Sequence, residues 1–174
     1  MVFTTTVSRY CTAAGLVDFM SASKSGTKES VLRQDSAGKA RNATRVRSQG
    51  TRPYILIADD NKDIREFLAK LLEKQFSVTT ASDGRACLNK ASAAPPDCIL
   101  ADINMPHLNG VDTIKLLRRD PRLGQIPIIA MTAYGNWAAA KALAAGATIV
   151  MLKPLDGDDL LATINKLVND VTAK

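Results

Sequence analysis

Short runs of apolar residues recur along the chain from residue 54 onward, separated by longer stretches in which apolar residues lie three or four positions apart. Four of these runs are apolar at consecutive positions, which is typical of strands buried on both faces of a sheet. A fifth run, Ser77–Thr80, is shorter and more polar, as expected for an edge strand. The predicted buried strands are Tyr54–Ala58, Cys98–Ala101, Ile126–Met131 and Ile149–Leu152.

The stretches between these runs have the spacing of amphipathic helices. Gly84–Ala93 is followed by two prolines, and Asn136–Ala145 is followed by Gly146, which are common ways for a helix to end. Asn61 is in position to cap the first helix. The apolar positions that define the other three helices are Ile64, Phe67, Leu68, Leu71 and Leu72, then Val111, Ile114 and Leu117, then Leu160, Leu161, Ile164, Leu167, Val168 and Val171.

Five strands that alternate with five helices are typical of a parallel sheet with helices on both faces. Because crossovers between parallel strands are right-handed, few strand orders remain. We therefore expect a doubly wound five-stranded α/β sheet with the flavodoxin-like order 2-1-3-4-5.

Residues 1–51 differ in composition from the rest of the chain. The formal net charge of the 174 residues is +6, and residues 1–50 hold eight basic and only three acidic side chains. This Ser/Thr-rich stretch has too few large apolar residues to offset the entropy of ordering its backbone. We expect a disordered basic extension over 1–51 and one domain over 52–174. A transit peptide and a docking segment for a partner are alternative interpretations of its first residues, whereas a start site at Met20 is compatible with the disordered extension.

The same composition disfavours several classes of protein. No apolar run approaches the roughly 18 residues that a membrane span needs. Ala13–Val17 is a weak secretory signal because Asp18 follows it directly. The three cysteines, Cys11, Cys87 and Cys98, are odd in number and show no CxxC spacing. This pattern favours reduced thiols, and hence a cytoplasmic protein, over a disulfide framework or a zinc site.

Acidic residues follow two of the predicted strands at their carboxyl ends. Asp59 and Asp60 follow the first strand, and Asp102 follows the third, its neighbour in the expected order. Ligands of open parallel sheets bind at this edge. Two carboxylates about 4 Å apart repel by roughly 4 kcal/mol at an effective dielectric near 20, so a cation is expected among them. Mg²⁺ fits best, because it prefers carboxylate and water oxygens.

The remaining strand ends add a hydroxyl and a positive charge. Thr132 follows the fourth strand and Lys153 the fifth. Carboxylates, magnesium, one lysine and one hydroxyl suit the transfer of a phosphoryl group onto a carboxylate, because positioning and charge neutralisation do most of that chemistry.

Four segments of the chain, YILIADDN, ILADINMPHLNGVD, IPIIAMTAYG and AAGATIVMLKP, resemble receiver domains of two-component response regulators. The resemblance covers about residues 52–173. The motifs that carry it are the acid pair, the D-x-x-M-P-x-x-x-G run, the Thr-Ala pair after the fourth strand and the Lys-Pro pair after the fifth.

The resemblance implies roles for the acidic residues. Asp102 would be the phosphoacceptor. Asp60 and Asp102, with the main-chain carbonyl of Asn104, would hold Mg²⁺, and Asp59 would act through a bound water. Met105-Pro106 and Gly110 would shape the loop beneath the site.

The resemblance also implies a conformational switch. Thr132 and Lys153 would contact the phosphoryl oxygens and couple phosphorylation to conformation. The family usually has Tyr or Phe three residues before the lysine, where this chain has Val150, with Tyr134 as the nearby aromatic. The departure leaves the phosphorylation chemistry untouched and concerns only how the switch is read out.

On this resemblance we expect a stand-alone receiver. A histidine kinase or phosphotransfer protein would donate the phosphoryl group, and the switch would act on a downstream target protein. The chain would catalyse only its own phosphorylation and dephosphorylation. No DNA-binding domain is expected, because little sequence follows the last predicted helix. The alternative is a phosphorylation-independent pseudo-receiver that serves as an interaction module.

Other functions fit the residues less well. A flavin carrier needs a Ser/Thr/Gly-rich phosphate loop after the first strand, where this chain has Asp59-Asp60-Asn61. An aspartyl phosphatase or phosphomutase usually has a second acid two residues after its nucleophile, where this chain has Asn104. Nucleic-acid binding by the basic extension is weakly supported, because the extension has few aromatic residues for base stacking.

Overall fold

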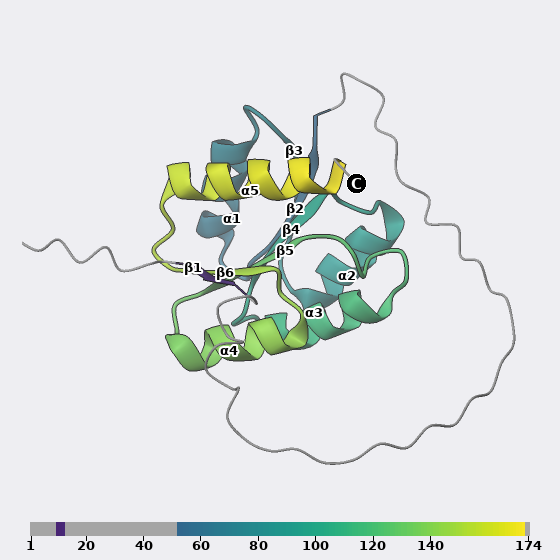
Figure 1. The fold of residues 1–174 in the computed structure, drawn as a ribbon, viewed down its shortest axis with the longest axis vertical. Coiled ribbons are helices and arrows are strands. Elements are labelled where there is room, and N and C mark those ends of the chain that lie inside the picture. The colour runs from purple at the N-terminus through teal and green to yellow at the C-terminus, as the bar shows by residue number, and fades with distance from the viewer. Residues whose placement is uncertain (1–9, 13–51, 173–174) are drawn as a thin grey trace, which may run out of the picture.

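A computed structural model describes residues 10–12 and 52–172, which form one sheet covered by helices (Figure 1). The strands are β1 (Tyr10–Thr12), β2 (Tyr54–Ala58), β3 (Ser77–Ala81), β4 (Cys98–Asp102), β5 (Ile128–Thr132) and β6 (Ile149–Leu152). Their order across the sheet is β1-β6-β5-β4-β2-β3. The strands from β2 to β6 pair in parallel, so the predicted order 2-1-3-4-5 is confirmed for these five.

Helices cover both faces of the sheet, as Figure 1 shows. They are α1 (Lys62–Leu72), α2 (Gly84–Ala93), α3 (Gly110–Arg119), α4 (Asn136–Ala145) and α5 (Gly157–Thr172). One apolar cluster joins the sheet to α1 and α5, and the other joins it to α2, α3 and α4. This is the doubly wound arrangement that alternating strands and helices predict.

The central strands are apolar because they are buried on both faces. Along β2, Ile55 and Ile57 face the cluster with α1 and α5, whereas Leu56 and Ala58 face the cluster with α2, α3 and α4. All four are fully buried. Side chains alternate between faces along a strand, so an uninterrupted apolar run supplies both layers of the core.

The ends of two helices agree with the sequence. The Asn61 side chain accepts hydrogen bonds from the main-chain N–H groups of Asp63 and Ile64, at 2.9 and 3.2 Å. Gly146 ends α4 with a φ of 107°, a backbone conformation that favours glycine. One expected core residue is exposed, however. Phe67 lies at the margin of the apolar stripe of α1, and 59% of its surface is accessible.

Strand boundaries differ slightly from the predicted ones. The strand expected from Ile126 begins at Ile128, because Pro127 has no N–H group to join the ladder. β3 and β4 each extend one residue further than predicted, to Ala81 and Asp102. None of the helices among the described residues has the length and apolar character needed to span a membrane.

Strand β1 departs from the disordered extension expected over 1–51. It pairs antiparallel with β6, with Tyr10 opposite Met151 and Thr12 opposite Ile149. Three residues in a polar surrounding give no periodic signal, so this pairing depends on the edge that β6 offers. The rest of that expectation concerns residues 1–9 and 13–51, which lie outside the described residues.

Candidate functional site

The carboxyl ends of four parallel strands bring the predicted site residues to one edge of the sheet. Asp59 follows β2, Asp102 ends β4, Thr132 ends β5 and Lys153 follows β6. The register aligns Ala58 with Ala101 and Thr132 with Leu152, so these strands end at similar levels. Residues that are up to 94 positions apart in sequence thus become neighbours.

Lys153 joins two of the acidic residues. Its Nζ lies 2.7 Å from Asp59 Oδ2 and 2.7 Å from Asp102 Oδ1. Both aspartates are buried, with exposed fractions of 1% and 4%. Two carboxylates therefore share one ammonium group, and the buried cluster keeps an excess of negative charge.

The main chain fixes the second oxygen of each carboxylate. Asp59 Oδ1 accepts a hydrogen bond from the N–H of Asn61 at 2.9 Å. Asp102 Oδ2 accepts one from the N–H of Asn104, also at 2.9 Å. With one oxygen on Lys153 and the other on a backbone N–H, neither carboxylate is free to rotate.

The electrostatics of the cluster follow from its burial. Burial raises the pKa of Asp102, and the negative charge of Asp59 adds to this effect, against the opposing contributions of Lys153 and the Asn104 N–H. For Lys153, burial alone would lower the pKa, but the hydrogen bonds and charges of Asp102 and Asp59 outweigh it, and the pKa is raised. A positively charged Lys153 is thus a stable part of the site.

Asp60 occupies a different position from the other two acids. It is exposed at the rim of the site, one residue beyond Asp59. Its main-chain carbonyl accepts a hydrogen bond from Arg65 Nη1 at 3.0 Å, and the same nitrogen donates to the carbonyl of Asp59 at 2.8 Å. Arg65 on α1 thereby holds the backbone of the acid pair. Sequence reasoning missed Arg65, because an arginine on a polar helix face usually indicates only solvation.

The structure does not gather the three predicted acids into a ready-made set of metal ligands. Within residues 10–12 and 52–172, no three His, Cys, Asp or Glu side chains are arranged to hold a metal ion. The oxygen donors of Asp59, Asp60 and Asp102 nevertheless suit a hard divalent cation. Mg²⁺ needs only one or two carboxylates, because water and phosphate oxygens complete its coordination.

The Thr132 side chain is buried, and its hydroxyl is engaged with the backbone of Tyr134. Its Oγ1 accepts a hydrogen bond from the Tyr134 N–H at 3.0 Å and lies 3.2 Å from the Tyr134 carbonyl. The Tyr134 ring is about half exposed, and its hydroxyl lies 3.5 Å from the Asn104 amide nitrogen. Val150 is buried in the core beneath α4. The Thr132 carbonyl accepts a hydrogen bond from the Lys153 N–H at 2.8 Å, which places these residues beside the acid cluster of Asp59, Asp102 and Lys153.

Comparison with known proteins identifies the family. A model of the response regulator receiver domain matches residues 55–165. The chain is 33% identical over 124 residues to hybrid signal transduction histidine kinase D of Dictyostelium discoideum, and the match covers 71% of this chain and 8% of that protein. It is 35% identical over 115 residues to the response regulator PleD of Caulobacter vibrioides, covering 65% of this chain and 25% of that protein.

Solved structures agree with these matches. The chemotaxis protein CheY4 of Vibrio cholerae is 31% identical with a TM-score of 0.64, and the match covers 67% of this chain and 99% of that one. The receiver domain of a signal transduction histidine kinase from Syntrophus aciditrophicus is 27% identical with a TM-score of 0.67, covering 70% and 94% of the two chains. This chain belongs to the response regulator receiver domain family of two-component signalling systems.

Proposed function

We propose that Asp102 accepts a phosphoryl group in a Mg²⁺-dependent reaction and that the chain then signals to a partner protein. The observation that carries this proposal is the contact of one ammonium group, that of Lys153, with the two buried carboxylates of Asp59 and Asp102. Two buried carboxylates that share one ammonium group leave an excess negative charge in the site, and such a charge does not stabilise the fold. We therefore take the cluster as evidence of a functional role.

The donor in this proposal is a phosphohistidine on a histidine kinase or a phosphotransfer protein. The Asp102 carboxylate forms a bond to phosphorus as the bond between phosphorus and the imidazole nitrogen breaks. The electron pair of that bond returns to the imidazole ring, whose other nitrogen carries a proton, so the cationic phosphoimidazolium ring leaves as neutral imidazole. Lys153, at 2.7 Å from Asp102 Oδ1, offsets negative charge on the oxygens that surround the transferred group.

The residues present fit Mg²⁺ as the resident metal. The carboxylates of Asp60 and Asp102 and the main-chain carbonyl of Asn104 would hold it, with Asp59 acting through water. The excess of negative charge in the site supports this assignment. Burial and the charge of Asp59 raise the pKa of Asp102 even though Lys153 is in contact with it, so Lys153 alone does not balance the two carboxylates. When bound, Mg²⁺ supplies positive charge beside the phosphoryl oxygens.

The signal in this proposal begins at Thr132. Its hydroxyl exchanges its hydrogen bonds to the Tyr134 backbone for one to the acyl phosphate on Asp102. This exchange moves the loop between β5 and α4, which carries Tyr134, and repositions the face built from α4, β6 and α5. The downstream partner distinguishes the two positions of this face.

Intact mass after incubation with Mg²⁺ and acetyl phosphate tests the proposal. We expect the wild-type chain to gain one phosphoryl group and Asp102→Asn to gain none. Asp112→Asn is a matched control, because Asp112 is on α3 and its carboxylate is hydrogen-bonded to Lys115 and Asn109 rather than to Lys153. Omission of Mg²⁺ should prevent the gain. An equal gain in wild type and Asp102→Asn, or no gain in either, would remove Asp102 as the phosphoacceptor.

A phosphorylation-independent interaction module is the second candidate. Val150 favours it, because a small buried side chain occupies the position where the family has its mobile aromatic ring. The mass experiment separates the two, since this candidate requires no phosphoryl gain. We place either activity in the cytoplasm, where the free thiols of Cys87 and Cys98 would remain reduced.

A further inference from the structure

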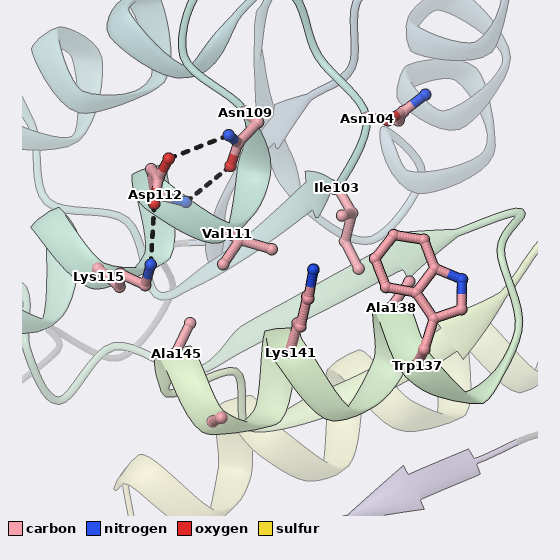
Figure 2. A pocket seen from close by; sticks show the side chains of 11 residues that line it. Ile103, Asn104, Asn109, Val111, Asp112, Lys115, Trp137, Ala138, Lys141 and Ala145 are labelled. Atoms are coloured by element: carbon pink, nitrogen blue, oxygen red, sulfur yellow. Dashed lines mark hydrogen bonds and ion pairs between the residues drawn. The ribbon is translucent and has the colours of Figure 1, made fainter.

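A groove of about 550 Å³ lies between α3 and α4 (Figure 2). Ile103 and Asn104, which directly follow Asp102, form one end of it. Trp137 stands at the same end, on the first turn of α4, and Ala145 lies near the other end. The groove therefore starts at the candidate phosphorylation site and runs along α4.

The groove exists because α4 presents small side chains towards α3. Ala138 and Ala145 are buried at its base, with Val111 of α3 across from them. The methyl groups of alanine are too short to fill the space between the two helices, so a groove with an apolar floor remains. The apolar surface of this floor is exposed, and a side chain of a partner would cover it.

Two aromatic side chains are exposed at the Trp137 end of the groove: Trp137, which lines it, and Tyr134, whose ring lies beside the Trp137 ring. Trp137 is 61% accessible and Tyr134 is 49% accessible. Their ring centroids are 6.5 Å apart, with an angle of 54° between the ring planes. Exposed Trp and Tyr side chains beside a pocket are the residue types that contribute most to protein–protein binding.

The charges along the groove are unequal on its two walls. On the α3 wall, Lys115 Nζ lies 2.9 Å from Asp112 Oδ1, and Asn109 donates to the same carboxylate at 3.0 Å. On the α4 wall, Lys141 lies 4.5 Å from the centre of the Trp137 ring. No carboxylate of residues 52–170 forms an ion pair with Lys141. The groove thus presents one ammonium group, that of Lys141, which stands over an aromatic ring and above an apolar floor without a carboxylate partner among these residues.

We propose that this groove is the docking site for an acidic amphipathic segment of a partner protein. One carboxylate of that segment meets Lys141, and an apolar side chain lies on the alanine floor beside Trp137. A nucleotide fits less well, because its phosphates carry two or more charges and the groove offers one free ammonium group with the Asp112 carboxylate opposite.

Docking should respond to phosphorylation, a dependence that rests on the proposed function. Asn104, which lines the groove, contacts both Asp102 and the turn that carries Tyr134. Its N–H donates to Asp102, and its amide nitrogen lies 3.5 Å from the Tyr134 hydroxyl. Trp137 is on the helix that follows the Thr132–Tyr134 turn. Movement of that turn towards Asp102 therefore alters the end of the groove at which Trp137 stands.

The fluorescence of Trp137 tests the docking directly, because it is the only tryptophan of the chain. The probe is a synthetic alanine-based helical peptide with leucine and glutamate four residues apart, and its twin has lysine in place of each glutamate. We expect a saturable change in Trp137 emission with the acidic peptide and none with the basic one. Lys141→Glu should weaken binding of the acidic peptide at least about tenfold and allow the basic peptide to bind.

Lys70→Glu is the matched control, because Lys70 is exposed on α1, on the opposite side of the sheet. It should leave the affinity for the acidic peptide unchanged. The control also accounts for peptide attracted to the basic residues 1–50, which neither substitution alters. Equal responses to both peptides, or an affinity unchanged by Lys141→Glu, would overturn the docking site.

The variant Asp102→Asn distinguishes a failure of the docking site from a failure of the proposed phosphorylation. We expect the unphosphorylated wild type to bind the acidic peptide, because the groove needs no phosphate to exist. Acetyl phosphate with Mg²⁺ should change the affinity of wild type alone. A phosphorylated wild type whose affinity is unchanged would overturn the coupling, and an absence of phosphoryl gain would overturn the proposed function while the docking result stands.

Discussion

Gly110 packs directly against the main-chain carbonyl of Asp102, the residue that ends β4. A Cβ atom at this position would overlap that carbonyl oxygen and lie 2.7 Å from the Cα of Ile103. The Gly110 N–H also donates to the Ile103 carbonyl at 2.9 Å. The loop after Asp102 therefore closes on itself through a contact that leaves no space for a side chain.

We expect Gly110→Ala to lower the free energy of unfolding by about 2 kcal/mol or more, because the added methyl group has to displace backbone. Urea unfolding measures this loss. Gly135→Ala is the matched control, since no heavy atom lies within 4 Å of the Cβ it would add. A loss for Gly110→Ala that is no greater than for Gly135→Ala would contradict the expected clash.

Asp102→Asn should raise the stability of the protein at pH 7 when no divalent cation is present. Burial raises the pKa of the Asp102 carboxyl, so the folded chain binds this proton more readily than the unfolded chain does. The contribution of Asp102 to the free energy of unfolding is therefore most favourable at a pH below its pKa in the unfolded chain. It becomes less favourable as the pH rises through the higher pKa that Asp102 has in the folded chain. The advantage of Asp102→Asn should accordingly shrink as the pH is lowered.

Asp112→Asn provides a control of opposite sign for the unfolding measurements. Hydrogen bonds from Lys115 and Asn109 lower the pKa of the Asp112 carboxyl, so its ionised form favours the folded state. Loss of this charge should give no gain in stability. If Asp102→Asn were no more stable than the wild type at pH 7, the burial of an unfavourable charge at Asp102 would be refuted.

Arg65→Met should weaken Mg²⁺ binding on the order of tenfold, if Mg²⁺ binds as proposed. Arg65 Nη1 donates to the carbonyls of both Asp59 and Asp60, and groups that orient metal ligands typically contribute this much to affinity. Calorimetric titration with Mg²⁺ measures the change. Arg65→Lys should recover part of it, and Arg85→Met, an exposed change on α2, should have no effect. Equal affinities for Arg65→Met and the wild type would exclude this role.

The phosphoryl group on Asp102 should be longer-lived than in the fastest members of the family. If Asp102 is phosphorylated as proposed, the side chains of Asn104 and Tyr134 would limit the access of water to it, because the Tyr134 hydroxyl lies 3.5 Å from the amide nitrogen of Asn104, two residues beyond Asp102. We expect Tyr134→Ala to shorten the lifetime several-fold, as followed by the decay of the phosphorylated mass after donor removal. A half-life of only seconds in the wild type would contradict this expectation.

The sheet and the contact among Asp59, Asp102 and Lys153 could be predicted from the sequence for one physical reason. Parallel strands end at one edge, so residues that directly follow buried apolar runs become neighbours whatever their separation in the chain. The position of the Asp60 side chain could not be predicted in this way. Successive side chains leave a strand in different directions, and only the structure shows Asp59 buried and Asp60 exposed.

Features that depend on non-periodic contacts could not be predicted. Arg65 acts through its guanidinium on two backbone carbonyls, and no motif marks such a contact. The groove depends on which alanines of α4 face α3, and an alanine-rich helix has no clear apolar side. Nothing in the sequence indicated that the Thr132 hydroxyl would hydrogen-bond to the Tyr134 backbone.

The pairing of β1 with β6 has a consequence for solubility. A bare edge strand offers unpaired backbone groups to any other chain, and β6 is made of four apolar residues, Ile149–Leu152. With β1 in place, the other outermost strand of the described sheet is β3, whose sequence SVTTA is much more polar. Fragments that begin after residue 12 would expose the apolar strand instead, and they should self-associate more readily than the full chain.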